Sequence, residues 1–372
     1  AAVPSWREAP LSETERLKVL QILSASRDRN LNALRDLATS EGGLIEDEVR
    51  RTAWPVLLGT NGDQQGAAQS EWKLLPKHKD EDQVQLDVNR AFVYYPEDES
   101  TKRTDARKQE LSNVIVAVLR THPMLHYFQG YHDIVQVLLL VLGADAAVPA
   151  VAQLSLLRIR DFMLPTMKGT EPHLQLVPTI IHAVDPGLYK HLSNMQPFFA
   201  LAATLTLYAH DIEEYGDIAR LFDFLLASAA VTPLYLYAAI VISRKQELLD
   251  FEADEPEMLY AVLSKLPKPL DLDELIQQTM AIFRAHPPES LPGMVWPQVS
   301  SNSVLKTTRD PRALSQQTLS DGERMFEKQA AELERAEFRK RTVLQMQQLA
   351  RHYKRPAGLT GIAIAVAVLA YW

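Results

Sequence analysis

The sequence predicts an all-α protein, and three observations lead to this prediction. Apolar residues recur at spacings of three and four over residues 15–39, 107–122 and 215–230, which is the pattern of amphipathic helices. No stretch sustains the two-residue alternation of a strand, and no tight turn joins two strand-like runs. The Asn61-Gly62 pair instead opens a polar stretch that is predicted to be a loop.

The composition suits a folded chain with an ordinary surface. The chain has 372 residues, 47% of them hydrophobic, which is enough for one large or two smaller domains. Its formal net charge is -8, so the charge gives no reason to expect nucleic-acid binding. The chain contains no cysteine, which excludes disulfides and metal sites built on thiolates.

Shifts in composition divide the chain into five segments. The predicted segments are a helical N-terminal extension at 1–41, a main helical domain at 42–284, a Pro/Ser-rich linker at 285–322, a long polar helix at 323–356 and an apolar segment at 357–372. The extension contains Ser12 and Glu15 at the spacing of a capping box. The linker has no period, and it is expected either to be disordered or to fold back on the main domain.

The last two segments have features of chains that bind a membrane. Residues 358–372 carry no charge and follow the basic run "RHYKRP", which is the pattern of a membrane anchor with its basic flank in the cytosol. Fifteen residues at about 1.5 Å each reach about 22 Å, short of the roughly 30 Å of a bilayer core. An anchor cut within its length and a buried or interfacial helix both stay open. The polar helix before it is expected to be a stalk or weak coiled coil, or a membrane-surface helix.

The stretch 121–143 holds the most concentrated polar side chains next to an apolar run. His122 and His126 lie four apart, but Pro123 stands where a zinc protease has its glutamate, and Asp133 is the one acidic residue nearby. We therefore predict no metal site. The chain also lacks a GxxxxGK[ST] loop and a GxSxG elbow, so no hydrolase activity of its own is expected.

A second polar site lies before the stretch 121–143 in the sequence. Asp87 and Arg90 lie three apart on a predicted helix, so their side chains can touch. An aspartate beside an arginine fixes the direction of the guanidinium and leaves other donors free. The spacing alone equally fits an ordinary surface ion pair.

Three motifs in order give a family resemblance. The stretches "RRTAWPVLLG" (50–59), "VQLDVNR" (84–90) and "YFQGYHDI" (127–134) resemble RxxxWxxLLG, IxxDxxR and YxQG, the signature motifs of the TBC domain of Rab GTPase-activating proteins. A later stretch, "YAHDIEEYGDIARLFDFLL", resembles the helix of that family with an R-x-W-D pattern. The resemblance covers roughly residues 42–269 and implies a multi-helix TBC domain.

The resemblance implies a mechanism in trans on a Rab small GTPase in its GTP-bound form. The GTPase would hold GTP and magnesium, so the chain would need no cofactor of its own. Arg90 would be the arginine finger, whose permanent positive charge neutralises the charge that builds on the phosphate oxygens. Gln129 would be the glutamine finger, because an amide can accept from the attacking water and donate to the γ-phosphate at once.

Other motif residues are predicted to support the fingers or the domain. Asp87 would aim Arg90, Tyr127 and Tyr131 would flank Gln129, and Gly130 would allow a close backbone approach. Arg51 and Trp54, in the first motif, are predicted to pack the domain. Arg220 and Asp223, in the late motif, are predicted to be structural or to lie near the partner surface.

The chain departs from the family pattern at three places, none of them a finger. Val84 replaces isoleucine, Tyr131-His132 stands where Met-Asn is commoner, and Phe222 replaces the tryptophan of R-x-W-D. The Tyr-His form, with the terminal apolar segment, is similar to the membrane-anchored branch of the family at the endoplasmic reticulum, which acts on the Rab of ER-to-Golgi transport. That similarity implies a chain facing the cytosol on endoplasmic reticulum or early Golgi membranes, in vesicle trafficking. The alternative is a catalytically inactive Rab-binding scaffold on an internal membrane.

Overall fold

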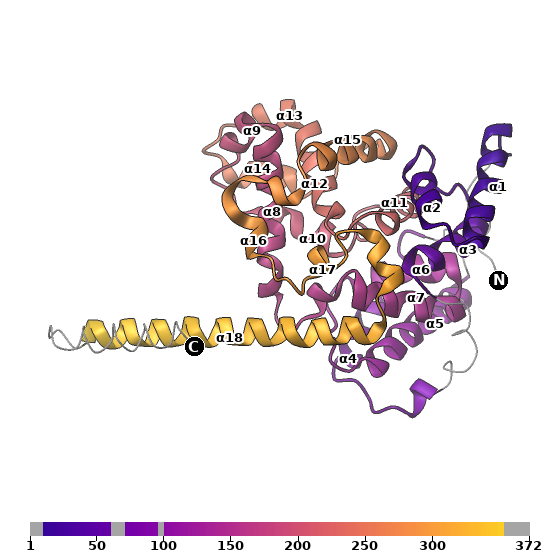
Figure 1. Cartoon of the computed structure of the whole chain (residues 1–372), viewed down its shortest axis with the longest axis horizontal. Helices are drawn as coiled ribbons and strands as arrows, with labels where there is room; N and C mark the ends of the chain where they lie inside the picture. Colours follow the sequence, from indigo (N-terminus) through magenta and orange to yellow (C-terminus); the bar gives the residue numbers. More distant parts are fainter. Residues whose placement is uncertain (1–9, 61–70, 96–99, 353–372) are drawn as a thin grey trace.

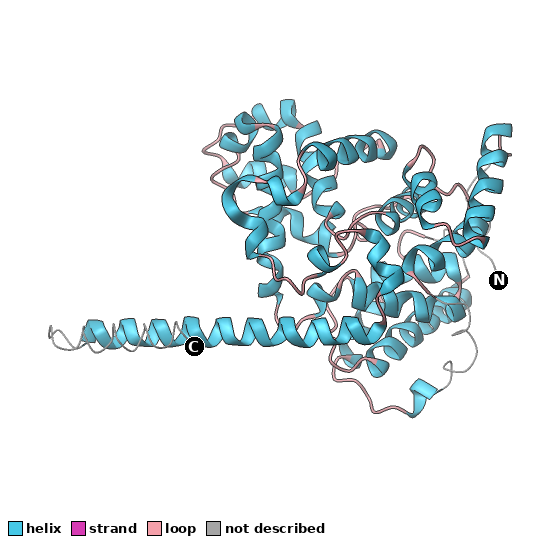
Figure 2. Ribbon diagram, viewed as in Figure 1, coloured by secondary structure: helices cyan, strands magenta, loops and turns pink. Residues whose placement is uncertain are grey.

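The computed structural model describes residues 10–60, 71–95 and 100–352, and these residues form helices and connecting loops without a strand. Figure 2 shows the arrangement, which confirms the all-α prediction. Ser12 caps the first helix: its hydroxyl accepts from the backbone N–H of Glu15, whose carboxylate accepts from the backbone N–H of Ser12. The helix therefore begins where the capping box predicts it.

The first half of the chain forms one packed group of helices. Its α-helices are α1 (Glu13–Arg27), α2 (Leu31–Thr39), α3 (Asp47–Leu58), α4 (Glu81–Val88), α5 (Thr101–Thr121), α6 (Tyr131–Leu142) and α7 (Ala144–Leu157). Helix α1 packs on α3, and α5, α6 and α7 pack on one another. Eleven of the twelve residues of α6 are buried between these neighbours, so this helix has almost no polar face.

The second half forms a further group around α12. Its α-helices are α8 (Glu171–Val184), α9 (Pro186–His191), α10 (Leu201–Leu205), α11 (Tyr215–Ala227), α12 (Thr232–Ser243), α13 (Lys245–Leu249), α14 (Pro256–Leu263) and α15 (Leu272–Ala285). Helix α12 lies between α8 and α15, whereas α11 returns to pack on α2 and α3 of the first group (Figure 1). Helix α11 thus joins the two groups.

Short helices complete the described residues. They are η2 (Glu71–Leu74), η3 (Arg160–Met163), η4 (Met167–Thr170), η5 (Pro197–Ala200), η6 (Pro288–Ser290), η7 (Pro292–Met294), α16 (Val295–Gln298), α17 (Val304–Thr307) and η8 (Pro311–Gln316). The last five lie in segment 285–322, which the sequence left either disordered or folded back. The segment folds back on the domain.

Buried contacts hold segment 285–322 in place. Val304, Leu305 and Leu314 are buried in the core. The carboxylate of Asp161, itself buried, accepts from the hydroxyl of Ser303 and from the backbone N–H of Val304, the latter at 3.1 Å. Pairing of this carboxylate offsets the cost of burying its charge, so the segment is part of the domain.

Helix α18 (Leu319–His352) is docked at its beginning and extends beyond the domain (Figure 1). Phe326 is buried, and Gly322 approaches α7 so closely that a Cβ there would lie 2.9 Å from the Cβ of Leu156. Further along, Lys168 Nζ contacts Glu337 Oε1 at 2.6 Å, and after this pair Phe338 is 65% exposed. No helix among the described residues is both long and apolar enough to cross a bilayer. The predicted anchor at 357–372 lies outside the described residues.

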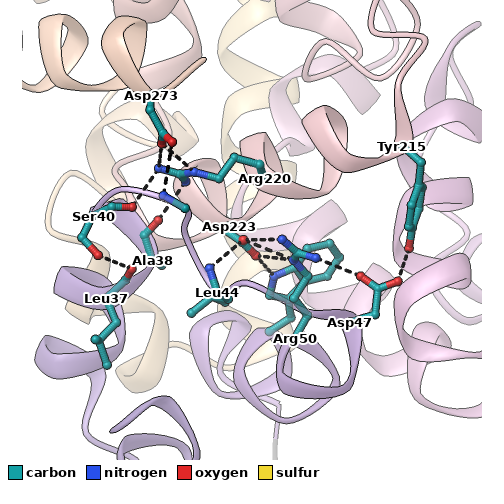
Figure 3. Close-up of polar contacts among 12 residues, drawn as sticks. Leu37, Ala38, Ser40, Leu44, Asp47, Arg50, Tyr215, Arg220, Asp223 and Asp273 are labelled. Atoms are coloured by element: carbon teal, nitrogen blue, oxygen red, sulfur yellow. Dashed lines mark hydrogen bonds and ion pairs between the residues drawn. The ribbon is translucent and has the colours of Figure 1, made fainter. Parts of the chain in front are cut away.

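A buried carboxylate joins α11 to α3 (Figure 3). Asp223 accepts from Arg50 Nε at 3.0 Å, from Trp54 Nε1 at 2.8 Å and from the backbone N–H of Leu44 at 2.9 Å. Arg50 Nη1 also donates to Asp47 at 2.9 Å, and all these side chains are buried. The ion pair of Arg50 with Asp223 fixes the position of the first helix group on the second through charge-assisted hydrogen bonds.

The other predicted packing residues surround this centre. Arg220 donates to the backbone carbonyls of Ala38 and Ser40 and to Asp273, which holds the end of α2 (Figure 3). Arg51 is half-buried and its Nε donates to the carbonyl of Val141 at 2.8 Å. Arg50, which the sequence analysis did not single out, is the arginine of the buried pair.

Candidate functional site

A groove of about 620 Å³ opens beside α4, α6 and α10. Both predicted fingers, Arg90 and Gln129, line it. The other side chains on its wall divide into a polar and an apolar set. The polar set includes His132, Asp133, Gln136 and His210, and the apolar set includes Val93, Tyr94, Phe198 and Tyr260. The apolar side chains are partly exposed, and an exposed apolar set beside polar groups is typical of a surface that binds another protein.

Arg90 lies just after the end of α4, on a rigid support. Its Nη2 donates to Asp87 Oδ1 at 2.5 Å. The side chain of Arg90 is 66% exposed, whereas that of Asp87 is 0% exposed. Asp87 also accepts from Tyr127 through its second oxygen, at 3.0 Å. A buried carboxylate with both oxygens occupied holds one side of the guanidinium and leaves the remaining donors directed at the groove.

The backbone after Arg90 is held in an unusual conformation. Phe92 has a φ of 61°, which is uncommon for a residue other than glycine. Its backbone N–H donates to Gln136 Oε1 on α6 at 2.9 Å. This contact fixes the turn that directs the chain away from Arg90 and along the groove.

Gln129 lies at the tip of the loop before α6. Its side chain is exposed and makes no hydrogen bond to the rest of the described chain. Gly130, which caps α6, has a φ of 100°. A Cβ at Gly130 would lie 2.6 Å from Thr206 Cγ2, so the close approach that the glycine allows is to this side chain of the same chain. The loop can present Gln129 only if residue 130 has no side chain.

Substitution of Gly130 by alanine should lower stability more than the same change at Gly42. Both glycines have positive φ, but a Cβ at Gly42 meets nothing within 4 Å. The left-handed conformation alone costs about 1–2 kcal/mol, and the overlap with Thr206 adds to this at Gly130. Chemical denaturation of the two variants measures the difference, and equal losses would contradict the close packing described for Gly130.

The two tyrosines around Gln129 have different roles. The hydroxyl of Tyr127 donates to Asp87, and burial and the Asp87 carboxylate raise the pKa of Tyr127, so the hydroxyl stays protonated. Tyr131 is fully buried, and its hydroxyl lies 2.6 Å from the hydroxyl of Ser155 on α7. The rings of Tyr127 and Tyr131 meet edge to face at 5.9 Å. Tyr131 therefore supports Tyr127 from the core and does not line the groove beside Gln129, because α6 begins at this residue and turns it toward α7.

The structure adds polar residues to the site that the sequence analysis gave no role. His132 Nδ1 lies 3.2 Å from the Tyr127 hydroxyl, and His132 Nε2 lies 3.2 Å from Asp133 Oδ1. His210 Nδ1 lies 3.0 Å from Asp133 Oδ2. His132 follows the Gln-Gly pair directly, so its position in the motif was a usable signal. His210 comes from a distant loop, and no local pattern in the sequence indicates it.

The two histidines considered for a metal face different elements. His122 Nδ1 lies 2.7 Å from Glu323 of α18. His126 Nε2 lies 2.9 Å from Lys79 Nζ. A group of three or more histidine, aspartate or glutamate side chains arranged to hold a metal is not found within residues 10–60, 71–95 and 100–352.

Comparison with known proteins identifies the family. The model of the Rab-GTPase-TBC domain matches residues 47–249. TBC1 domain family member 20 of Bos taurus is 37% identical over 278 residues, which are 74% of this chain and 68% of the relative. GTPase-activating protein gyp10 of Schizosaccharomyces pombe is 32% identical over 318 residues, 84% of each chain. The crystal structure of the Ypt/Rab-GAP domain of Gyp1p superposes with a TM-score of 0.57 at 14% identity, covering 71% of this chain and 98% of that one, which shows a shared fold. The chain belongs to the TBC-domain family of Rab GTPase-activating proteins.

Proposed function

We propose that the chain accelerates GTP hydrolysis by a Rab small GTPase by supplying Arg90 and Gln129 in trans. The observation that carries this proposal is their placement: both side chains are exposed on one groove, and Arg90 is held from behind by the buried Asp87. A site with these two groups and an apolar wall suits a protein partner that brings its own nucleotide. The GTPase holds GTP and magnesium, and the chain completes the site.

The two side chains have separate tasks in this mechanism. As the bond to the γ-phosphoryl group breaks, charge builds on the phosphate oxygens, and the guanidinium of Arg90 neutralises it. Its Nη2 stays on Asp87, so the guanidinium enters the site without losing its orientation. The amide of Gln129 accepts a hydrogen bond from the attacking water through its oxygen and donates one to the γ-phosphate through its nitrogen. It takes the place of the glutamine with which a GTPase orients that water.

A panel of purified Rab proteins loaded with GTP tests this proposal. Phosphate release is measured with and without the chain, and the doubly substituted chain, Arg90→Ala with Gln129→Ala, is the control. We expect strong stimulation of one or a few Rabs by the native chain and none by the control. Binding of a GTP-loaded Rab without stimulation would instead favour the catalytically inactive scaffold.

The proposal extends to the place of action. The uncharged segment 358–372 follows a basic run, and this order favours a membrane anchor with its flank in the cytosol. Confined to endoplasmic reticulum or early Golgi membranes, the chain meets its Rab at a raised effective concentration and regulates ER-to-Golgi vesicle traffic.

Deletion of residues 357–372 should release the chain from membranes. The apolar segment supplies the burial that holds it there, whereas α18 alone is polar for most of its length. Fractionation of cells that express the full and the shortened chain with the same fluorescent tag measures the change. An unchanged membrane fraction would contradict the anchor, while stimulation of a Rab in solution should be the same for both chains.

A further inference from the structure

A continuous chain of polar contacts runs beneath the groove from the tip of α4 to the loop after α10. In order, the contacting side chains are Arg90, Asp87, Tyr127, His132, Asp133 and His210. Each neighbouring pair is within 3.2 Å. These contacts connect the arginine finger just after α4 with the beginning of α6, where Gln129 is presented. A group that fixes Tyr127 or His132 therefore also fixes Arg90, through Asp87.

When His132 is neutral, this series of side chains has too few protons for every contact to be a hydrogen bond. The hydroxyl of Tyr127 has a single proton, which it gives to Asp87 when Arg90 is held as described. The hydroxyl oxygen must then accept from His132 Nδ1. A neutral imidazole with its proton on Nδ1 presents a lone pair on Nε2 to the carboxylate of Asp133, which is unfavourable. With its proton on Nε2, the ring instead competes with Asp87 for the hydroxyl proton of Tyr127.

Protonation of His132 removes this conflict. An imidazolium donates from both nitrogens, to the Tyr127 oxygen and to Asp133, and the Tyr127 proton is then committed to Asp87. We propose that His132 is a positioning residue for the arginine finger, acting through the Tyr127 hydroxyl and Asp87, and that the charge on its imidazole sets how firmly Arg90 is held. The inference rests on the proposed function of Arg90.

The groups around His132 determine when it carries this charge. The charged or titratable groups that face it are Asp133 on its own helix, Asp87 from α4, Arg90 just after α4, Tyr127 from the preceding loop and His210 from the loop after α10. Burial lowers the pKa of His132 from 6.5, although Asp133 and Asp87 oppose the effect. The contact with Asp133 raises the pKa of His210. The ring of His132 therefore favours the neutral form and takes up its proton at a lower pH than an ordinary histidine does.

Two substitutions separate the two contacts of His132. Asparagine places an amide near the position of Nδ1 and can still donate to the Tyr127 oxygen, whereas glutamine reaches toward the position of Nε2 and keeps only the contact with Asp133. Relative to the native chain at a pH where His132 is protonated, we expect His132→Asn to retain the stimulated kcat within about twofold and His132→Gln to lose about tenfold, the rate equivalent of one hydrogen bond. KM for the GTP-loaded Rab should change little in both variants, because His132 is largely buried and the exposed apolar side chains of the groove are unchanged. Equal kcat in the two variants, or a rise of KM as the main effect, would overturn the inference.

Tyr127→Phe breaks the same link while keeping the ring, so it should lower kcat as His132→Gln does even if a histidine variant folds poorly. Combined with Arg90→Ala, each of these substitutions should cause no further loss, since they act only through the finger. A further loss in that background would overturn the inference. If Arg90→Ala itself retained full stimulation, the proposed function would have failed, and this result is distinct from a failure of the role of His132.

The pH profile gives a second readout that a purely structural role would not change. The stimulated kcat of the native chain, divided by the intrinsic rate of the same Rab, should rise as the pH is lowered through the acidic range in which His132 takes up its proton. His132→Asn should remove this rise. His210→Asn should keep it, because His210 takes up its proton at higher pH. The same slope in the native chain and in His132→Asn would overturn the role of the imidazole charge.

Discussion

Substitution of Arg90 by alanine should lower the stimulated rate of GTP hydrolysis by about 10³-fold or more, because an arginine finger contributes roughly 10³–10⁵ in rate for small GTPases. The side chain is 66% exposed, and its described ion pair is to the neighbouring Asp87, so its removal should leave the fold intact. Binding of the GTP-loaded Rab should change far less than the rate, because charge on the γ-phosphate develops mainly in the transition state. Single-turnover phosphate release and a binding titration measure the two effects separately.

The chain offers a closely matched control for Arg90. Arg324 on α18 is 61% exposed and contacts an aspartate three residues earlier at 2.5 Å, as Arg90 does. Arg324→Ala should therefore lose the same kind of surface ion pair with no effect on stimulation. A comparable fall in rate for both variants would contradict a specific role for Arg90.

Gln129→Ala should lower the stimulated rate of GTP hydrolysis by about 10²–10³-fold, the usual contribution of one positioned polar group in such a site.

Substitution of Asp223 by alanine should produce the largest loss of stability among single changes in the network between α3 and α11. The carboxylate is fully buried and accepts from Arg50, Trp54 and the backbone of Leu44. Its removal leaves the buried charge of Arg50 with Asp47 alone and strands two other donors, which should cost about 3–5 kcal/mol. Urea denaturation measures the change.

Asp273→Ala is the control for Asp223, since Asp273 also binds an arginine of the same network. Its side chain is 36% exposed, and its partner Arg220 keeps two backbone carbonyls, so the loss should be about 1 kcal/mol or less. Similar losses for the two variants would mean that the buried pair is no more important than its exposed neighbour.

Much of the fold could be predicted because the signals were local. Helical spacing over 15–39, 107–122 and 215–230 indicated the all-α class, and mixed charges with a sparse apolar stripe indicated the long last helix. The order of segment 285–322 could not be predicted, because its helices are only a few residues long and its burial depends on Asp161, far away in the sequence. Periodicity cannot be seen in helices of that length.

The candidate site was predictable to the extent that motifs carry it. The spacing of Asp87 and Arg90 was enough to bring their side chains together, and the motif order indicated Gln129. The role of Arg50 could have been predicted, because Arg50 and Trp54 lie four apart and so share one helix face, unlike Arg51. The contact between Asp133 and His210 joins residues from α6 and a distant loop, and only the three-dimensional structure brings them together.

The proposed mechanism depends most on Gln129 acting in place of the glutamine of the GTPase. The measurement that tests this directly is single-turnover GTP hydrolysis by a responsive Rab whose own water-orienting glutamine has been replaced by leucine. We expect that the native chain still stimulates this Rab strongly and that Gln129→Ala does not. Stimulation of the native Rab together with none of the leucine variant would contradict it, because the orienting amide would then come from the GTPase.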